Sequence, residues 1–342
     1  MSERINLKAL SKDEVFRFVG DAGLPRFRAG QLLRWIYQKH ASSLADITEF
    51  SRDLRGRLEK TAYISSLEAA DRRLSSDGTE KFLFRLEDGR TIESVLIPDE
   101  DRLTLCISSQ VGCAMGCRFC LTGRLGLLRN LRAFEIVDQV VAVNRMLGPR
   151  RAVSNIVLMG MGEPLANFDE VVEALWRITS LVGISKRRIT LSTAGLVPRM
   201  RPLAERAPEV NLAVSLNATT DKTRDDIMPV NRKYPLKQLL DACRAYPLSP
   251  RRRITFEYVL LSGVNDSVAD AARLVKLVHG IRCKINLIPF NPHAGADLRR
   301  PSVERVLAFQ KVLTDHHLTA LIRESRGQDI LAACGQLMAA HQ

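Results

Sequence analysis

Seven short apolar runs, separated by stretches with helical periodicity, occupy the chain from Leu103 onward. Such alternation predicts parallel strands joined by crossover helices, because parallel neighbours need a long connection between them. The runs are apolar on both faces, as expected of strands buried in a barrel. Seven strands fit an incomplete α/β barrel better than a closed barrel of eight. The runs are TLCISS (104–109), NIVLMG (155–160), RITLS (188–192), VNLAVSL (210–216), RITFEYVLL (253–261), CKINLIP (283–289) and LTALIRE (318–324).

The residues before this region have a different pattern. From Ser11 to about Tyr63, apolar residues recur at three- and four-residue spacing, which is typical of amphipathic helices. The stretch KFLFRLEDGRTIESVLIP (81–98) instead has two extended runs around Asp88 and Gly89, a pair suited to a tight hairpin turn. With 342 residues, 46% of them apolar, the chain can bury a substantial core. We therefore expect a helical accessory domain (1–75), a hairpin linker (76–102) and a partial barrel with a C-terminal cysteine-bearing segment (103–342).

The charge balance points to a polyanionic partner. The formal net charge is +13 and the sequence pI is about 9.7. Each basic cluster alone equally fits a solvated surface, but together with the pI the clusters favour nucleic acid. The chain has no apolar run near the roughly 18 residues of a membrane span and no signal-peptide pattern at its start, so we expect a cytoplasmic protein without a membrane partner. The clusters lie at 150–151, 186–188, 251–253 and 299–300.

Three of the seven cysteines, Cys113, Cys117 and Cys120, stand within eight positions in the spacing C-x3-C-x2-C. An odd number of cysteines without a secretory signal argues against a disulfide framework and favours metal binding or catalysis. Zinc is one alternative, but a structural zinc site usually has four ligands and no further cysteine or histidine follows closely. Three thiolates can instead hold three irons of a 4Fe-4S cluster and leave the fourth iron open.

With Phe119 before its last cysteine, this motif resembles the signature of the radical S-adenosylmethionine (SAM) superfamily. The resemblance implies a (β/α)6-type partial barrel, a 4Fe-4S cluster on Cys113, Cys117 and Cys120, and SAM at the fourth iron. In that superfamily an electron from the cluster cleaves SAM to a 5′-deoxyadenosyl radical. The missing fourth ligand would then leave room for the cofactor, as in an open catalytic metal site.

Five longer segments are similar to the RlmN type of RNA adenine carbon-2 methyltransferase, and the similarity spans nearly the whole chain. The resemblance implies two SAM per turnover and methylation of one adenosine of 23S rRNA (position 2503 in the usual rRNA count). It leaves open whether adenosine 37 of tRNA is also a substrate. It further implies an RNA-binding helical domain, a flavodoxin or ferredoxin as electron donor, and a monomer. The segments are GMGEPLAN (160–167), SKRRITLSTAG (185–195), SLNATTDKTRDDIMPVNRKYPL (215–236), INLIPFNPHAGA (285–296) and RESRGQDILAACGQL (323–337).

The same resemblance assigns SAM contacts to positions that follow predicted strands, where an α/β barrel places its site. Taken alone, each glycine or serine among them fits an ordinary turn. Many family members have histidine at the position of Asn217. The assigned positions are Gly162, Glu163, Ser192, Ser215, Leu216, Asn217 and Asn291.

Three further residues receive catalytic roles by resemblance. Cys334 corresponds to the cysteine that one SAM methylates and whose methyl group, converted to a radical with a second SAM, adds to the adenine. Cys106 corresponds to the thiol that attacks the Cys334 sulfur and forms a transient disulfide. Glu93 corresponds to the acceptor of the carbon-2 proton. Without the resemblance, both cysteines would pass for packed apolar residues and Glu93 for an exposed hairpin residue.

Two other functions stay open on the sequence alone. A Cfr-type methyltransferase modifies carbon 8 of the same ribosomal adenosine and shares both extra cysteines, although Pro164 fits the carbon-2 group. A non-catalytic RNA-binding protein with an iron–sulfur cluster is the second alternative. It would need neither Cys106 nor Cys334, so the presence of both favours an enzyme.

Overall fold

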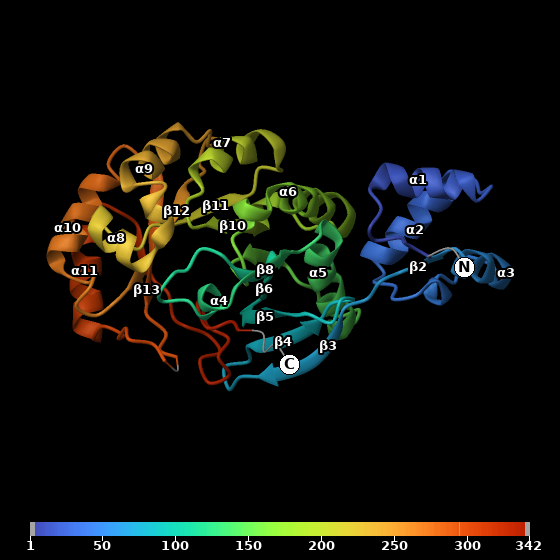
Figure 1. The fold of residues 1–342 in the computed structure, drawn as a ribbon, viewed down its shortest axis with the longest axis horizontal. Coiled ribbons are helices and arrows are strands. Elements are labelled where there is room, and N and C mark those ends of the chain that lie inside the picture. Colours follow the sequence, from blue (N-terminus) through green and yellow to red (C-terminus); the bar gives the residue numbers. More distant parts are fainter. Residues whose placement is uncertain (1–3, 294, 339–342) are drawn as a thin grey trace.

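A computed structural model describes residues 4–293 and 295–338. A ten-stranded sheet in the order β14-β13-β12-β11-β10-β9-β6-β5-β4-β3 curves through the molecule, and helices cover its outer side (Figure 1). The strands are β3 (Glu68–Leu74), β4 (Glu80–Arg85), β5 (Thr91–Asp99), β6 (Arg102–Cys106), β9 (Asn155–Leu158), β10 (Ile189–Thr193), β11 (Asn211–Ser215), β12 (Ile254–Leu260), β13 (Cys283–Pro289) and β14 (Ala320–Ile322). The helices around the barrel are α5 (Ala133–Leu147), α6 (Phe168–Arg177), α7 (Val197–Arg206), α8 (Asp221–Ile227), α9 (Leu236–Ala245), α10 (Val268–Leu277) and α11 (Val303–Asp315).

The parallel half of the sheet confirms the predicted partial barrel. β6 and β9 to β14 each pair in parallel with their barrel neighbours. Each of the seven predicted runs overlaps one of these strands. Leu191, Phe256 and Leu287 are fully buried, as expected of parallel strands that are covered on both faces. β14 and β3 are the two edges of the sheet.

The other half is an antiparallel extension made of β3, β4 and β5. The predicted hairpin is confirmed, since β4 and β5 pair on either side of Asp88 and Gly89. Gly89 has a φ of 82°, a left-handed conformation that glycine adopts without strain. β3 lies inside the range expected to be helical, which is a correction. Its sequence EAADRRL is largely exposed on both faces, so it lacks the apolar alternation that identifies a strand.

A helical lobe lies at one end of the molecule, blue in Figure 1. It contains α1 (Lys12–Asp21), α2 (Phe27–Tyr37) and α3 (Arg52–Glu59), with β1 (Ile5–Asn6) paired to β2 (Ala62–Tyr63). Ser11 and Glu14 form a capping box at the start of α1, which satisfies backbone donors there. A buried ion pair between Lys8 and Asp138 of α5 joins the lobe to the barrel. Arg177 of α6 also donates to the Lys8 carbonyl at 2.7 Å, so the lobe is fixed on two barrel helices.

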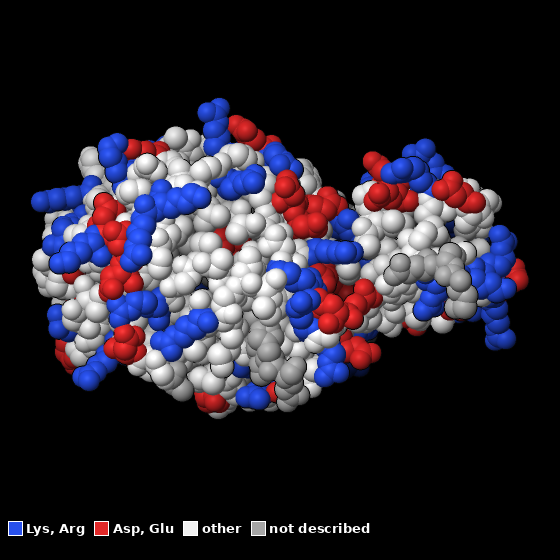
Figure 2. Space-filling model, in the orientation of Figure 1, with Lys and Arg blue, Asp and Glu red and all other residues white. Residues whose placement is uncertain are grey.

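On the side of the molecule shown in Figure 2, charged side chains lie mainly around the edge of the barrel, whereas its middle is largely uncharged. Two of the predicted basic clusters, 186–188 and 251–253, directly precede β10 and β12. They therefore lie at the end of the barrel opposite to the carboxyl ends of the strands. Arg252 donates to Asn211 at 2.6 Å and to the Glu209 carbonyl at 2.9 Å, which gives it a structural role. Within the described residues, no helix is both long and apolar enough to cross a membrane.

Candidate active site

The three clustered cysteines lie in a loop between two short elements. Cys113 ends β7 (Gln110–Cys113) and Cys120 directly precedes α4 (Leu121–Arg124), with Cys117 between them. β7 pairs with β8 (Gly126–Asn130) in a small hairpin that the sequence analysis missed. Gly112 has a φ of 78°, and a Cβ on it would lie 1.9 Å from the Gly126 carbonyl oxygen. Only glycine permits this close pairing, which holds Cys113 in place.

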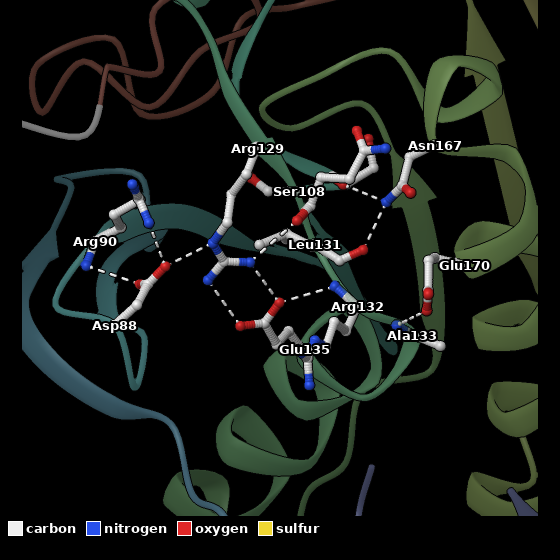
Figure 3. A network of polar contacts seen from close by, with 12 residues as sticks. Asp88, Arg90, Ser108, Arg129, Leu131, Arg132, Ala133, Glu135, Asn167 and Glu170 are labelled. Atoms are coloured by element: carbon white, nitrogen blue, oxygen red, sulfur yellow. Dashed lines mark hydrogen bonds and ion pairs between the residues drawn. The ribbon is translucent and has the colours of Figure 1, made fainter. Parts of the chain in front are cut away.

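A polar network ties this hairpin to its surroundings (Figure 3). Arg129 of β8 donates to both carboxylate oxygens of Glu135 on α5, at 2.8 and 2.9 Å, and to Asp88 at 2.6 Å. The hydrogen bonds that Arg129 donates to Glu135, opposed by partial burial, raise the pKa of Arg129. Asn167 donates to the Leu131 carbonyl at 2.7 Å, just beyond β8. Because such forked pairs are geometrically specific, the network fixes the cysteine loop against the hairpin between β4 and β5.

A cavity of about 160 Å³ lies between the cysteine loop and the carboxyl ends of the barrel strands. The structure brings together the three loop cysteines and six of the seven positions expected to contact SAM. Leu216 is the exception: its side chain is fully buried and its carbonyl accepts a hydrogen bond from Arg224 at 3.0 Å. The lining includes Cys113, Cys117, Cys120, Gly162, Glu163, Ser192, Ser215, Asn217, Asn291 and Cys334.

Glu163 and Gly162 shape one wall of this cavity. Glu163 accepts hydrogen bonds from the Thr193 hydroxyl at 2.7 Å and from the Ala194 backbone N–H at 2.6 Å. Burial raises the pKa of Glu163, and these hydrogen bonds oppose the rise. Gly162 has a φ of 101°, and a Cβ there would lie 2.6 Å from the Cβ of Gln110. Glu163 therefore braces two strand ends, and Gly162 allows the chain to pass close to β7.

Asn217 has a structural reason to be asparagine. Its φ is 57°, in the left-handed region where asparagine is enriched among non-glycine residues. Its side-chain oxygen accepts a hydrogen bond from the Val259 backbone N–H at 2.7 Å. The side chain thus fixes the carboxyl end of β12 while also lining the cavity.

Cys334 lies in an irregular segment, residues 323–338, that closes the cavity. Asn291 donates to the Cys334 carbonyl at 3.3 Å. The Leu121 backbone N–H donates to the Gly335 carbonyl at 2.8 Å, and the Thr122 hydroxyl donates to the Leu337 carbonyl at 2.6 Å. The segment is therefore anchored directly to α4, the helix that follows the cysteine loop.

The same segment is also anchored to the turn between β3 and β4. The Ser75 hydroxyl donates to Asp329 at 2.6 Å. The Gly327 backbone N–H donates to Asp77 at 2.9 Å. Cys334 is thus held from two sides, by the cysteine loop and by the antiparallel extension.

Cys334 and Cys106 meet around a second cavity. It has a volume of about 280 Å³, lies inside the barrel and is lined by both residues, whereas Cys334 also lines the first cavity. Both thiols are free. Burial, and then the neighbouring Cys334, raise the pKa of Cys106 well above its usual range. Cys334 is exposed, unlike the buried Cys106, but the protein atoms around its thiol, and then Glu257, raise the pKa of Cys334 to about 11. Both thiols are therefore protonated at neutral pH, and thiolate chemistry at either needs a base.

Glu93 is buried, so the view of it as an exposed hairpin residue is wrong. Its Oε1 lies 3.1 Å from Nζ of Lys81. Its Oε2 accepts a hydrogen bond from the Met338 backbone N–H at 2.7 Å. The carboxylate therefore faces the Cys334 segment from the antiparallel extension.

Two charged residues inside the barrel were missed from the sequence. Arg224 is fully buried and donates to the carbonyls of Ala194 and Ser215 at 2.8 and 3.1 Å; burial lowers its pKa to about 10, against the opposing effect of Cys117. Glu257 accepts from Asn286 at 2.9 Å and lines both cavities. A glutamate inside the apolar run RITFEYVLL was a usable signal for Glu257, whereas the polar stretch around Arg224 gave none.

The cysteine loop fits a multi-iron cluster better than a single ion. In the part of the chain that the structure describes, no three Cys, His, Asp or Glu side chains converge closely enough for one metal ion. A tetrahedral zinc needs its ligands around one point, whereas cluster cysteines bind different irons. Burial raises the pKa of Cys113 to about 12. Its thiolate form would therefore depend on the positive charge of bound metal.

Comparisons with known proteins agree with this geometry. Residues 107–275 match the family model of the radical SAM superfamily, and residues 5–64 match that of the ribosomal RNA large subunit methyltransferase N-terminal domain. The chain is 57% identical to the dual-specificity RNA methyltransferase RlmN of Geobacter sulfurreducens, over 98% of this chain and 93% of that protein. It is 56% identical to the RlmN of Geotalea uraniireducens, over 98% and 97%. A crystal structure of a radical SAM methyltransferase from Sphaerobacter thermophilus superimposes with a TM-score of 0.93 at 44% identity, covering 98% of this chain and all of that one.

The partial barrel, the three-cysteine loop and the adjoining cavity are thus those of a radical SAM protein, whose cofactors are a 4Fe-4S cluster and SAM. Within that superfamily the chain belongs to the RlmN family.

Proposed function

We propose that the protein methylates carbon 2 of one adenosine in 23S rRNA, at position 2503 in the usual count, and also adenosine 37 of tRNAs. Full-length similarity to dual-specificity RNA methyltransferases supports the substrate class. The observation that carries the proposal is the placement of Cys334 between the cofactor cavity and the cavity lined by Cys106. A cluster needs neither of these thiols, so their convergence beside it points to covalent chemistry on the substrate.

Cys113, Cys117 and Cys120 would hold the cluster, and the cavity residues, Ser192, Ser215 and Asn217 among them, would hold SAM. When bound, the cluster would supply the electron that cleaves SAM and would accept one electron from the RNA adduct before release. Carbon 2 of adenine is electron-poor, so it accepts a carbon radical but does not attack a methyl group. This protein's contribution is therefore to place a methylated cysteine beside the radical source.

Cys334 carries the methyl group in this mechanism. Its sulfur attacks the methyl carbon of the first SAM. The bond between that carbon and the SAM sulfur breaks, and the Cys334 thiol loses its proton. After hydrogen abstraction by the radical derived from the second SAM, the Cys334 methylene radical forms a bond to carbon 2. The RNA is then covalently attached through Cys334.

Release of the product requires both Glu93 and Cys106. The carbon-2 proton passes to Glu93, and the adduct loses one electron, which the bound cluster would accept. Cys106 sulfur attacks Cys334 sulfur, the Cys334 sulfur–carbon bond breaks with its electron pair on the methylene carbon, and the Cys106 proton completes the methyl group. The resulting disulfide then takes two electrons and two protons from a thiol reductant.

The two cysteines give opposite phenotypes, which tests the mechanism. In Cys106→Ala, Cys334 should still be methylated and should still form the bond to the adenine, but the methylated RNA should not be released. Protein linked to RNA should therefore accumulate as a shifted band that survives denaturation and disappears with ribonuclease. Cys334→Ala should form no adduct. Cys243→Ala, which removes another buried thiol, should turn over normally. Normal turnover of Cys106→Ala, or an adduct in Cys334→Ala, would contradict the assigned roles.

Mass spectrometry of RNA from a deletion strain decides the methylated carbon, because loss of 8-methyladenosine instead of 2-methyladenosine would identify the Cfr-type reaction. Analysing rRNA and tRNA separately tests both substrates. The proposal includes a flavodoxin or ferredoxin as electron donor and a monomeric, cytoplasmic protein. Reduction assays with each protein test the electron donor, and the mass in solution tests the oligomeric state.

A further inference from the structure

Lys81 is a charged residue buried in the antiparallel extension. Its side chain is 9% exposed, and its Nζ lies 3.1 Å from Oε1 of Glu93, which is 6% exposed. The same Nζ donates to the Leu331 carbonyl at 3.2 Å, three residues before Cys334. One ammonium group therefore contacts both the carboxylate and the segment that carries the methylated cysteine.

Strand register places this ion pair on the same face of the sheet as Cys106. Lys81 is opposite Val95 across β4 and β5, and Val95 is opposite Cys106 across β5 and β6. Glu93 is two residues before Val95 on β5, so its side chain points to the same face of the sheet. Val95 and Cys106 line the inner cavity of the barrel. The ion pair thus lies on the continuation of the reactive face, with Lys81 two strand spacings, about 10 Å, from Cys106.

The burial of Lys81 argues against two common roles of a lysine, stabilising the fold and binding RNA phosphate. A buried ion pair contributes little net stability, because removing two charges from water costs several kcal/mol. A lysine enclosed to this degree is also badly placed to bind an RNA phosphate. Among the described residues, the Glu93 carboxylate forms an ion pair with Lys81 and accepts a hydrogen bond from the Met338 amide, and of these two partners Lys81 carries the charge. Its position therefore fits an action on Glu93 itself.

We propose that Lys81 is a positioning residue for removal of the carbon-2 proton, acting through Glu93. The proposal rests on the proposed function. Lys81 fixes Oε1 through the 3.1 Å ion pair and so sets the orientation of the Glu93 carboxyl group. Oε2 accepts the proton after the Met338 N–H has released it. The carbon–hydrogen electron pair stays with the RNA adduct, and Lys81 takes no part in the proton transfer itself.

Lys81→Met tests this role because it keeps an unbranched chain and removes the charge. Cys334 methylation, measured by mass, should match the wild type, and the RNA-linked band should form. The decay of that band in a single turnover should slow at least tenfold and at most about 10⁴-fold, the upper end of what general-base catalysis contributes. RNA with deuterium on carbon 2 of the target adenosine should slow this decay more in Lys81→Met than in the wild type. Lys81→Arg, which restores a cation, should recover most of the rate.

Matched variants separate the outcomes. Lys237→Met removes an exposed lysine paired with Asp241 and should leave every step unchanged. Wild-type decay in Lys81→Met, or slower decay without a larger isotope effect, overturns the proposal. If Lys81→Met does not fold, Lys81→Gln is measured against Lys81→Arg with the same criteria. Absence of any adduct in Cys106→Ala would instead overturn the proposed function, so the two failures are distinguishable.

Discussion

Glu257 places an ionisable carboxyl inside the barrel. Burial raises its pKa from 4.5 to about 7, against the opposing hydrogen bond from Asn286. Between these two values the folded protein binds more protons than the unfolded chain. The free energy of unfolding therefore falls as the pH rises through this window, and the loss is complete above the folded-state pKa. A barrel with a neutral side chain at this position would not lose this free energy of unfolding at high pH.

Glu257→Gln should abolish this pH dependence, because the amide is neutral at every pH and its oxygen can still accept from Asn286. At pH 8 the variant should exceed the wild type by up to about 3 kcal/mol, given 1.36 kcal/mol per pKa unit. Near pH 4.5 the two should be equally stable. Urea unfolding followed by circular dichroism at each pH measures the difference in the free energy of unfolding. If this free energy changed with pH in the same way for both proteins, the prediction would be contradicted.

At the scale of elements, the hairpin of β7 and β8 presents the first cluster cysteine. Gly112 is its most constrained position, with a φ of 78° and a backbone oxygen 1.9 Å from where a Cβ would be. Non-glycine residues pay about 1–2 kcal/mol for the left-handed conformation alone. The hairpin cannot keep its pairing with a side chain there.

Gly112→Ala should therefore lose iron while the barrel stays folded. After anaerobic reconstitution, iron per chain should fall to less than half of the wild-type value, with the far-ultraviolet circular dichroism preserved. Gly30→Ala is the matched control: it lies within α2, nothing would contact its Cβ within 4 Å, and alanine favours a helix by about 1 kcal/mol. Full iron content in Gly112→Ala would show that the hairpin does not position Cys113.

Elements differed in how far the sequence could predict them. The barrel strands were predictable because they are apolar on both faces. β3 was not, since Arg72 and Arg73 give it a polar surface throughout. The cysteines were found by spacing and resemblance, but the partners of Glu93 were not. Lys81 reaches Glu93 only through the register of β4 and β5, and register is fixed by long-range packing that no local pattern contains.

At the scale of the whole molecule, we expect the helical lobe and the barrel to have separable tasks. The lobe matches a family model of its own over residues 5–64, and the ion pair of Lys8 with Asp138 joins it to α5. A deletion that ended in the turn between β4 and β5 would also remove β3, β4 and Lys81. The boundary for an experiment therefore lies before β3. We therefore expect the lobe to add RNA affinity and the barrel to carry the chemistry.

Deletion of residues 1–64, combined with Asp138→Asn to avoid an unpaired buried carboxylate, should weaken RNA binding and leave reductive SAM cleavage intact. The dependence of the logarithm of affinity on the logarithm of salt concentration should become shallower, by about 0.7–0.9 per lost phosphate contact. Full-length Asp138→Asn is the control. Unchanged RNA affinity and salt slope in the truncated protein would assign the lobe another task.

The anchoring of the Cys334 segment also sets an order of assembly. Its contacts with the antiparallel extension join residues far apart in the chain: Ser75 and Asp329 are separated by 254 positions, and Glu93 and Met338 by 245. Contacts of such long range form late in folding, since the loop entropy is lost before they are gained. The cysteine loop, whose own hairpin is local, can therefore take its final shape first. We therefore expect iron to reach an open pocket, with Cys334, the proposed methyl carrier, closing over a centre that is already built.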